Sequence, residues 1–218
     1  MRPVDPYAWS WDPDALILFP AMTAGYLLAV RQYPAPRWRI ACFVAAMVLL
    51  LAVSITPVDT IALHYLLSVH LLQNVVLAEW APVLAVLGIP PALARLAPRV
   101  PLLAALGLWV ANYVLWHLPW LYDAALRHQY TLLHLEHALY FGTGVLFWWP
   151  VVHGDHAPGA KAAYLFAAFV LASPIGLVLA LVPEPISDFY ADGPGLWGLS
   201  AITDQQIAES PHKPGPSA

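Results

Sequence analysis

Six long apolar stretches constrain the fold of this chain more than any other feature of its sequence. A helix needs about 20 largely apolar residues to cross a bilayer, and six stretches reach or approach that length. They are residues 15–30, 40–55, 61–87, 101–118, 130–152 and 161–182. The sequence therefore predicts an all-α, polytopic transmembrane helical bundle of about six spans within residues 1–182. Residues 183–218, rich in proline, glycine and acids, would form an exterior tail with a disordered end at 209–218.

The composition supports a membrane protein and excludes several other classes. Hydrophobic residues make up 61% of the 218 residues and charged residues 10%, whereas soluble domains are about 45–50% apolar and about 25% charged. A soluble enzyme could not bury so much apolar surface. Nine Lys and Arg against 13 Asp and Glu give a net charge of -4, which argues against nucleic-acid binding. The single cysteine, Cys42, excludes a disulfide framework and a cysteine-rich metal site.

The distribution of Lys and Arg predicts how the spans are oriented. One set of loops holds Arg31, Arg37, Arg39, Arg95, Arg99 and Lys161, and the other set, with both termini, holds Arg2, Arg127 and Lys213. Because cytoplasmic loops carry an excess of basic residues, the first set would face the cytoplasm. Both termini would then be exterior.

With this topology, five histidines fall in the outer half of the membrane. They are His64, His70, His117, His134 and His137. Ionisable groups within a span are costly and face a partner or a wet cavity, and imidazole is the commonest metal ligand. His134 and His137 are three residues apart, so both can point into one cavity. Together with His70 they predict a metal or cofactor site, with hydrogen bonding between helices as the alternative.

Two acidic residues also fall within expected spans. Glu136 could orient a metal-binding imidazole on a neighbouring helix. Glu79 could relay protons, or it could be a neutral, hydrogen-bonded carboxyl.

Short motifs follow one another along nearly the whole chain. They are Trp9-Ser10-Trp11-Asp12-Pro13, Ser68-Val69-His70-Leu71-Leu72-Gln73, Ala81-Pro82-Val83-Leu84, Gly88-Ile89-Pro90, Trp116-His117-Leu118-Pro119, Leu121-Tyr122-Asp123-Ala124-Ala125-Leu126, Leu135-Glu136-His137, Phe147-Trp148-Trp149-Pro150 and Thr203-Asp204-Gln205-Gln206-Ile207-Ala208. In this order they resemble the CtaG family of cytochrome c oxidase assembly factors, the integral-membrane kind associated with caa-type oxidases.

The resemblance implies a multi-pass protein of a bacterial plasma membrane that is needed to build active oxidase and handles copper. Its partners would be the lipid bilayer and cytochrome c oxidase subunits, and it would not be an enzyme. Five residues stand at the family's polar motif positions and are implied as metal ligands: His70, His117, His134, His137 and Asp204. Asp204 would join the histidines from the exterior tail.

The chain departs from the family pattern in two places. Asn74 replaces a second histidine, and Leu71 replaces a methionine, in the third span. Asparagine can hydrogen-bond at such a position but is a poor copper ligand. The family also continues after its Asp-Gln-Gln motif into another membrane span, which the resemblance implies is missing here.

The leading hypothesis is a copper-binding assembly factor that passes copper to a nascent oxidase subunit. A haem-binding membrane cytochrome is one alternative, with His70 and His117 or His134 as axial ligands. A small metal or proton transporter that uses Glu79, Glu136 and the histidines is another. A structural partner, whose polar groups only join helices, would bind no metal.

Overall fold

The computed structural model describes residues 4–191 and 193–209, and every regular element in that part of the chain is helical. The helices are α1 (Pro13–Gln32), α2 (Arg37–Ile55), α3 (Pro57–His64), α4 (Leu67–Val75), η1 (Val76–Trp80), α5 (Ala81–Gly88), α6 (Pro91–Ala94), α7 (Leu102–Trp116), α8 (Pro119–Arg127), η2 (Gln129–Leu133), α9 (His134–Val152), α10 (Pro158–Leu181), α11 (Asp188–Ala191) and α12 (Ala201–Glu209). The all-α prediction is confirmed. The end expected to be disordered lies, apart from Glu209, outside the described residues.

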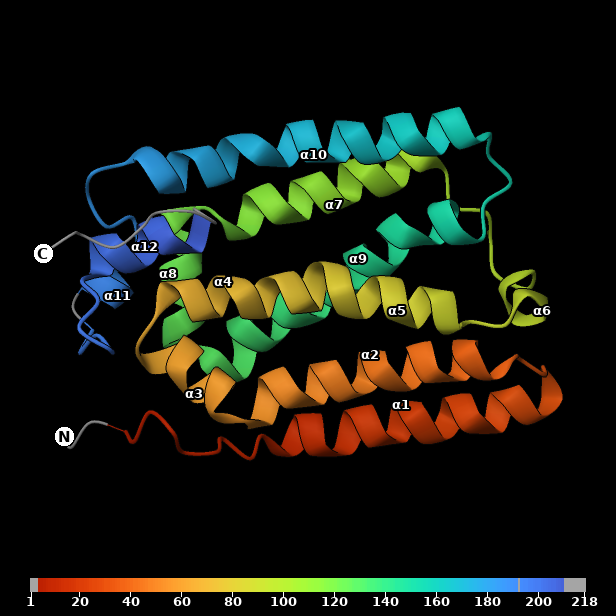
Figure 1. Ribbon diagram of the computed structural model, residues 1–218, viewed down its shortest axis with the longest axis horizontal. Helices are drawn as coiled ribbons and strands as arrows, with labels where there is room; N and C mark the ends of the chain where they lie inside the picture. The colour runs from red at the N-terminus through yellow and green to blue at the C-terminus, as the bar shows by residue number, and fades with distance from the viewer. Residues whose placement is uncertain (1–3, 192, 210–218) are drawn as a thin grey trace, which may run out of the picture.

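Helical runs cross back and forth between the two ends of the molecule (Figure 1). Within the described residues, four are long and apolar enough to span a membrane: α1, α2, the run Leu67–Gly88 and α10. A fifth span results if α7 and α8, which meet at 74°, are taken together. α9 is not among these candidate spans. Its first turn holds two histidines and Glu136, which lower its hydropathy. Four or five spans are close to the six expected.

The third expected span is broken near its start. Tyr65 and Leu66 leave the helical conformation, so α3 is separated from α4 and places His64 and His70 on different elements. Further along, the helix widens into the π-helical turn η1 just before Pro82. Because proline offers no N–H to the carbonyl four residues earlier and its ring crowds that carbonyl, the wider turn follows from the sequence.

The segment expected as an exterior tail folds back on the helices. α12 packs against α4 and α10, and the Tyr190 hydroxyl of α11 donates a hydrogen bond to the Ala62 carbonyl. Residues 183–191 and 193–209 therefore cover one end of the bundle, where the chain segment that precedes α1 also lies (Figure 1). Whether this end faces the exterior stays a prediction.

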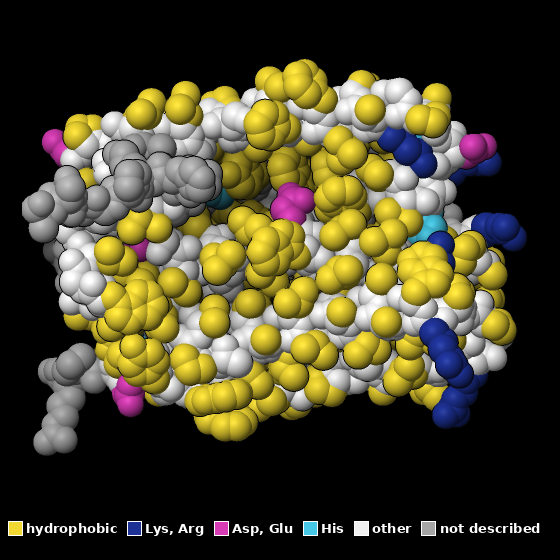
Figure 2. All heavy atoms as spheres, viewed as in Figure 1, with side chains coloured by type: hydrophobic (Ala, Val, Ile, Leu, Met, Phe, Trp, Pro, Cys, Tyr) yellow, Lys and Arg dark blue, Asp and Glu magenta, His cyan; other side chains and the backbone are white. Residues whose placement is uncertain are grey.

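The opposite end of the molecule is basic. Lys and Arg side chains gather there in Figure 2, beside the α1–α2 and α9–α10 connections, and apolar side chains cover the middle of the visible face. Lys and Arg therefore gather at one end of the helical bundle, as their distribution among the loops predicts.

The core lies where α2, η1, α5 and α9 meet. Ala46 of α2 and Ala81 of α5 are completely buried, which lets the helix backbones come close. Gly144 of α9 allows the closest approach. A Cβ at Gly144 would lie 2.7 Å from Pro82 Cγ and closer still to the Ala78 carbonyl oxygen.

We expect Gly144→Ala to destabilise the fold, because the added methyl group has no room between α9 and η1. Overpacking of this kind costs about 1–3 kcal/mol, or roughly 3–10 °C in the thermal midpoint. Gly142→Ala is the matched control in the same helix, since a Cβ there meets nothing within 4 Å. Thermal unfolding in detergent compares the two. An unchanged midpoint for Gly144→Ala would contradict the close approach.

Candidate metal-binding site

His70 is the most enclosed of the expected ligands. Its side chain is 0% exposed, and neither Nδ1 nor Nε2 has a hydrogen-bond partner within the described residues. Its ring packs edge-on against the rings of Tyr122 and Tyr190, with centroids 5.3 and 6.5 Å away. Buried polar groups in native proteins are normally paired, so an imidazole in this position calls for a partner from outside the chain.

His137 of α9 faces His70 of α4. The ring centroids are 6.2 Å apart at an interplanar angle of 49°, and the buried Nε2 of His137 is also unpartnered within the described part of the chain. Metal–nitrogen bonds of about 2.0–2.1 Å put two imidazoles on one ion at roughly 6 Å between ring centres. The separation of these two residues, here called the inner pair, therefore fits a shared ion.

Asn74 and Glu136 lie on the same two helices as the inner pair. Asn74 Nδ2 is 3.4 Å from Glu136 Oε1, a long hydrogen bond. Asn74 Oδ1 and Glu136 Oε2 are buried without partners among the described residues. A completely buried carboxyl on the helix that carries His137 can offset the charge of a bound cation. The role expected for Glu136 from the sequence, which is to orient a metal-binding imidazole, stays a prediction.

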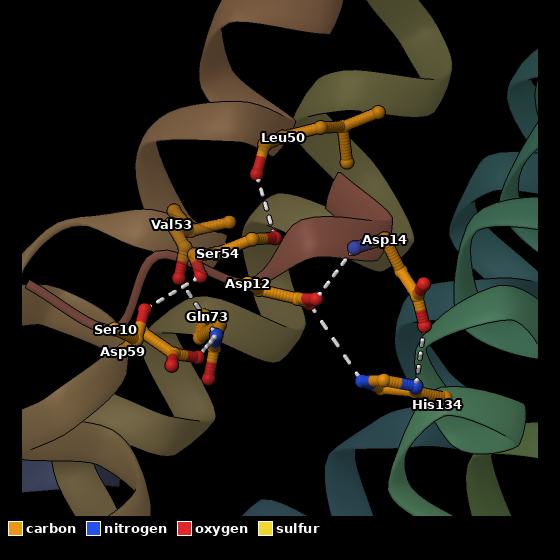
Figure 3. Close-up of polar contacts among 9 residues, drawn as sticks. All are labelled: Ser10, Asp12, Asp14, Leu50, Val53, Ser54, Asp59, Gln73 and His134. Atoms are coloured by element: carbon orange, nitrogen blue, oxygen red, sulfur yellow. Dashed lines mark hydrogen bonds and ion pairs between the residues drawn. The ribbon is translucent and has the colours of Figure 1, made fainter. Parts of the chain in front are cut away.

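The ring of His134 faces a different helix from the ring of His137, although the two residues are only three apart on α9. The His134 ring faces the start of α1, with Nε2 3.7 Å from Asp12 Oδ2 and Nδ1 3.7 Å from Asp14 Oδ2. Figure 3 shows one ring nitrogen of the imidazole turned to each of these two carboxyls, which come from the start of α1. Asp12 and Asp14 are not among the metal ligands expected from the sequence, although their place before the first span puts them at the level of His134. We call these three residues the mouth group.

A cavity of about 280 Å³ lies between two residues of the mouth group and His137 of the inner pair. Asp12, His134 and His137 all line it. Asp59 of α3 lines it too, and its Oδ1 accepts a hydrogen bond from Gln73 Nε2 at 3.0 Å. Burial raises the pKa of Asp59 from 3.8 to about 6, against the opposing effect of hydrogen bonds from Gln73 and Ser10. The cavity therefore combines imidazole and carboxyl groups.

His117 lies elsewhere, at the bend between α7 and α8. Its Nδ1–H donates a hydrogen bond to the Tyr113 carbonyl at 2.8 Å, the kind of contact that orients a metal-binding imidazole. It lines a second cavity of about 280 Å³ together with Glu79 and Asn74. Neither residue of the inner pair lines this cavity.

Asp204 does not join the histidines in this structure. Its carboxylate accepts hydrogen bonds from the Leu67 N–H at 2.6 Å, the Ser68 N–H at 3.3 Å and the Ser68 hydroxyl. These donors form the beginning of α4, where N–H groups lack partners within the helix. Asp204 therefore caps the helix that carries His70 and positions the site from a distance.

Glu79, in η1, lies apart from the inner pair and the mouth group. It lines a cleft of about 780 Å³ whose other walls include Trp109, Phe147 and Trp148. Neither the mouth group nor the inner pair lines this cleft.

We expect Asp204→Ala to lower stability without changing metal binding by the folded protein. Loss of a helix cap costs about 0.5–2 kcal/mol, and Asp204→Asn, which keeps one acceptor oxygen, should lose less. Thermal unfolding and metal content of the folded fraction are measured together. Loss of metal at unchanged stability would make Asp204 a ligand and overturn its role as a cap.

Asp59 predicts a dependence of stability on pH. Because folding raises its pKa, the protonated carboxyl contributes stability that is present below pH 4 and is lost as the pH rises through 6. The contribution is at most about 3 kcal/mol. We expect the thermal midpoint to fall from pH 5 to pH 8, and Asp59→Asn, which keeps the oxygen facing Gln73, to reduce that fall. Equal slopes in both proteins would contradict this assignment.

Comparison with known proteins confirms the resemblance seen in the motifs. The family model described as cytochrome c oxidase caa3 assembly factor (Caa3_CtaG) matches residues 24–209. This range includes the inner pair, His117 and Asp204, and it begins after Asp12 and Asp14. No curated protein and no solved structure matches the chain. Because the match covers most of its length, the chain belongs to the family of cytochrome c oxidase caa3 assembly factors.

Proposed function

We propose that this assembly factor binds a copper ion between His70 and His137 and passes it to a nascent cytochrome c oxidase subunit. The observation that carries the proposal is the completely buried imidazole of His70, unpartnered within the described residues, 6.2 Å from the ring of His137. Imidazole suits copper among the transition metals. Copper is here a cargo, and the protein acts as a carrier without catalysing a reaction.

The ligand set is suited to transfer. Two imidazoles leave coordination positions open to a ligand from the receiving subunit, and Glu136 can balance part of the ion's charge without being a third strong ligand. His117 hydrogen-bonds through Nδ1, so that Nε2 would be the nitrogen by which it binds an ion.

The distribution of basic residues supports one side of the membrane for this transfer. The basic end would face the cytoplasm of a bacterial plasma membrane. The inner pair, near the opposite end, would then lie toward the exterior. Both chain termini would be on that side too.

The packing favours a bare ion over haem. A macrocycle held by both imidazoles would occupy the space between their rings, where His70 is enclosed by Tyr122 and Tyr190. A Soret band in the purified protein would reverse this preference.

We expect His70→Ala/His137→Ala to weaken copper binding by at least roughly tenfold and to reduce the yield of active oxidase in cells. Copper content is measured by elemental analysis of detergent-purified protein, and oxidase maturation in cells that lack their own copy. His128→Ala is the matched control, because that side chain is exposed. His70→Gln/His137→Gln keeps polar side chains of similar size and tests the site if the alanine variant does not fold. Unchanged copper content and maturation would refute the proposal.

A further inference from the structure

The mouth group has the composition of a second cation site. Asp12 and Asp14 come from the start of α1, and His134 comes from the first turn of α9. One ligand atom from each residue lies within 4.8 Å of the other two. Two carboxylates and one imidazole are a ligand set typical of divalent first-row transition metals.

The distances within the mouth group exceed those of direct hydrogen bonds. Each ring nitrogen of His134 is 3.7 Å from its nearest carboxylate oxygen, whereas such bonds measure about 2.7–3.2 Å. Donors on one ion, each bound at about 2.0–2.2 Å, lie up to roughly 4 Å apart. The Asp14 side chain is 75% exposed, so a rotation of this side chain can bring the three donors onto one ion.

The position of Asp12 leaves one of its oxygens available. Its Oδ1 accepts a hydrogen bond from the Asp14 N–H at 2.9 Å and caps α1. The other oxygen, Oδ2, is the one that faces His134. The cap therefore holds Asp12 in place without using the oxygen that would bind a cation.

A second observation links the mouth group to a buried imidazole that could bind an ion. The cavity lined by Asp12 and His134 is also lined by His137, whose Nε2 is buried and unpartnered among the described residues. This cavity thus extends from Asp12 and His134 past Asp59 to His137, one member of the inner pair, whereas Asp14 and His70 are not among its lining residues.

We propose that Asp12, Asp14 and His134 form an outer site that captures a divalent transition-metal cation and delivers it to the inner pair. The delivery step rests on the copper-carrier function proposed above, whereas capture at the mouth does not. Among the divalent ions, Cu²⁺ binds such a set most tightly. Ca²⁺, which prefers six or more oxygens, binds poorly.

The capture step is tested in His70→Ala/His137→Ala, which removes the inner pair. Full-length protein without a polyhistidine tag is titrated with Cu²⁺, Zn²⁺ and Ca²⁺ in detergent. Adding Asp12→Asn/Asp14→Asn should weaken Cu²⁺ binding roughly 10–100-fold, and asparagine keeps the cap on α1. Asp5→Asn/Asp188→Asn removes two charges from exposed positions and should bind Cu²⁺ as the parent does. An equal loss in both variants, or in neither, overturns the site.

Electron paramagnetic resonance of Cu²⁺ bound to the variant that lacks the inner pair gives an independent readout. The spectrum of the outer site should show coupling to one imidazole nitrogen, and adding His134→Gln should remove that coupling. Nitrogen coupling that persists after His134→Gln overturns the ligand assignment.

The delivery step is tested in the protein with its inner pair intact. At limiting Cu²⁺, Asp12→Asn/Asp14→Asn should load the inner pair more slowly but reach the same final occupancy. Equal loading rates would overturn delivery, even if the outer site binds Cu²⁺. If removal of the inner pair leaves oxidase maturation unchanged, the carrier function fails while the titration still decides whether the outer site exists.

Discussion

Backbone N–H groups inside a membrane must find partners within the protein, and the break before α4 makes that requirement acute. The first N–H groups of α4 have no helical partners, and Asp204, 137 residues from Leu67, accepts hydrogen bonds from two of them. The same fold-back brings Tyr190 of α11 against His70. Capping of one helix start thus draws the C-terminal segment over the bundle and encloses the imidazole on which the proposed function depends.

The arrangement of the histidines follows from which helix each one meets. His134 and His137 are neighbours on α9, yet one faces the start of α1 and the other faces α4. His117 lies on a different element, at the bend before Pro119. One cavity reaches residues of both sets of donors. In the carrier function proposed above, uptake and release would take place at different residues.

Several features could be predicted from sequence because they depend on local pattern. Long apolar runs predicted the helices, and basic loops predicted one basic end. Asp204 was placed among the metal ligands because a motif records that a residue is polar but not which group it contacts. The approach of Asp12 and Asp14 to His134 could not be predicted for a related reason, since His134 lies more than 100 residues away on α9. The tail at 183–209 lacks a long apolar run, and its packing depends on contacts that no local pattern shows.

The sequence by itself determined the helical class, the family and the set of polar side chains near one end, because hydropathy and motifs are properties of short segments. Only the tertiary structure decided which of those side chains meet. His70 pairs with His137, His134 turns to α1, and Asp204 caps α4, because these contacts join segments that are distant in the chain. Their geometry depends on how close the helices can approach, which positions such as Gly144 and Ala81 control through the size of their side chains.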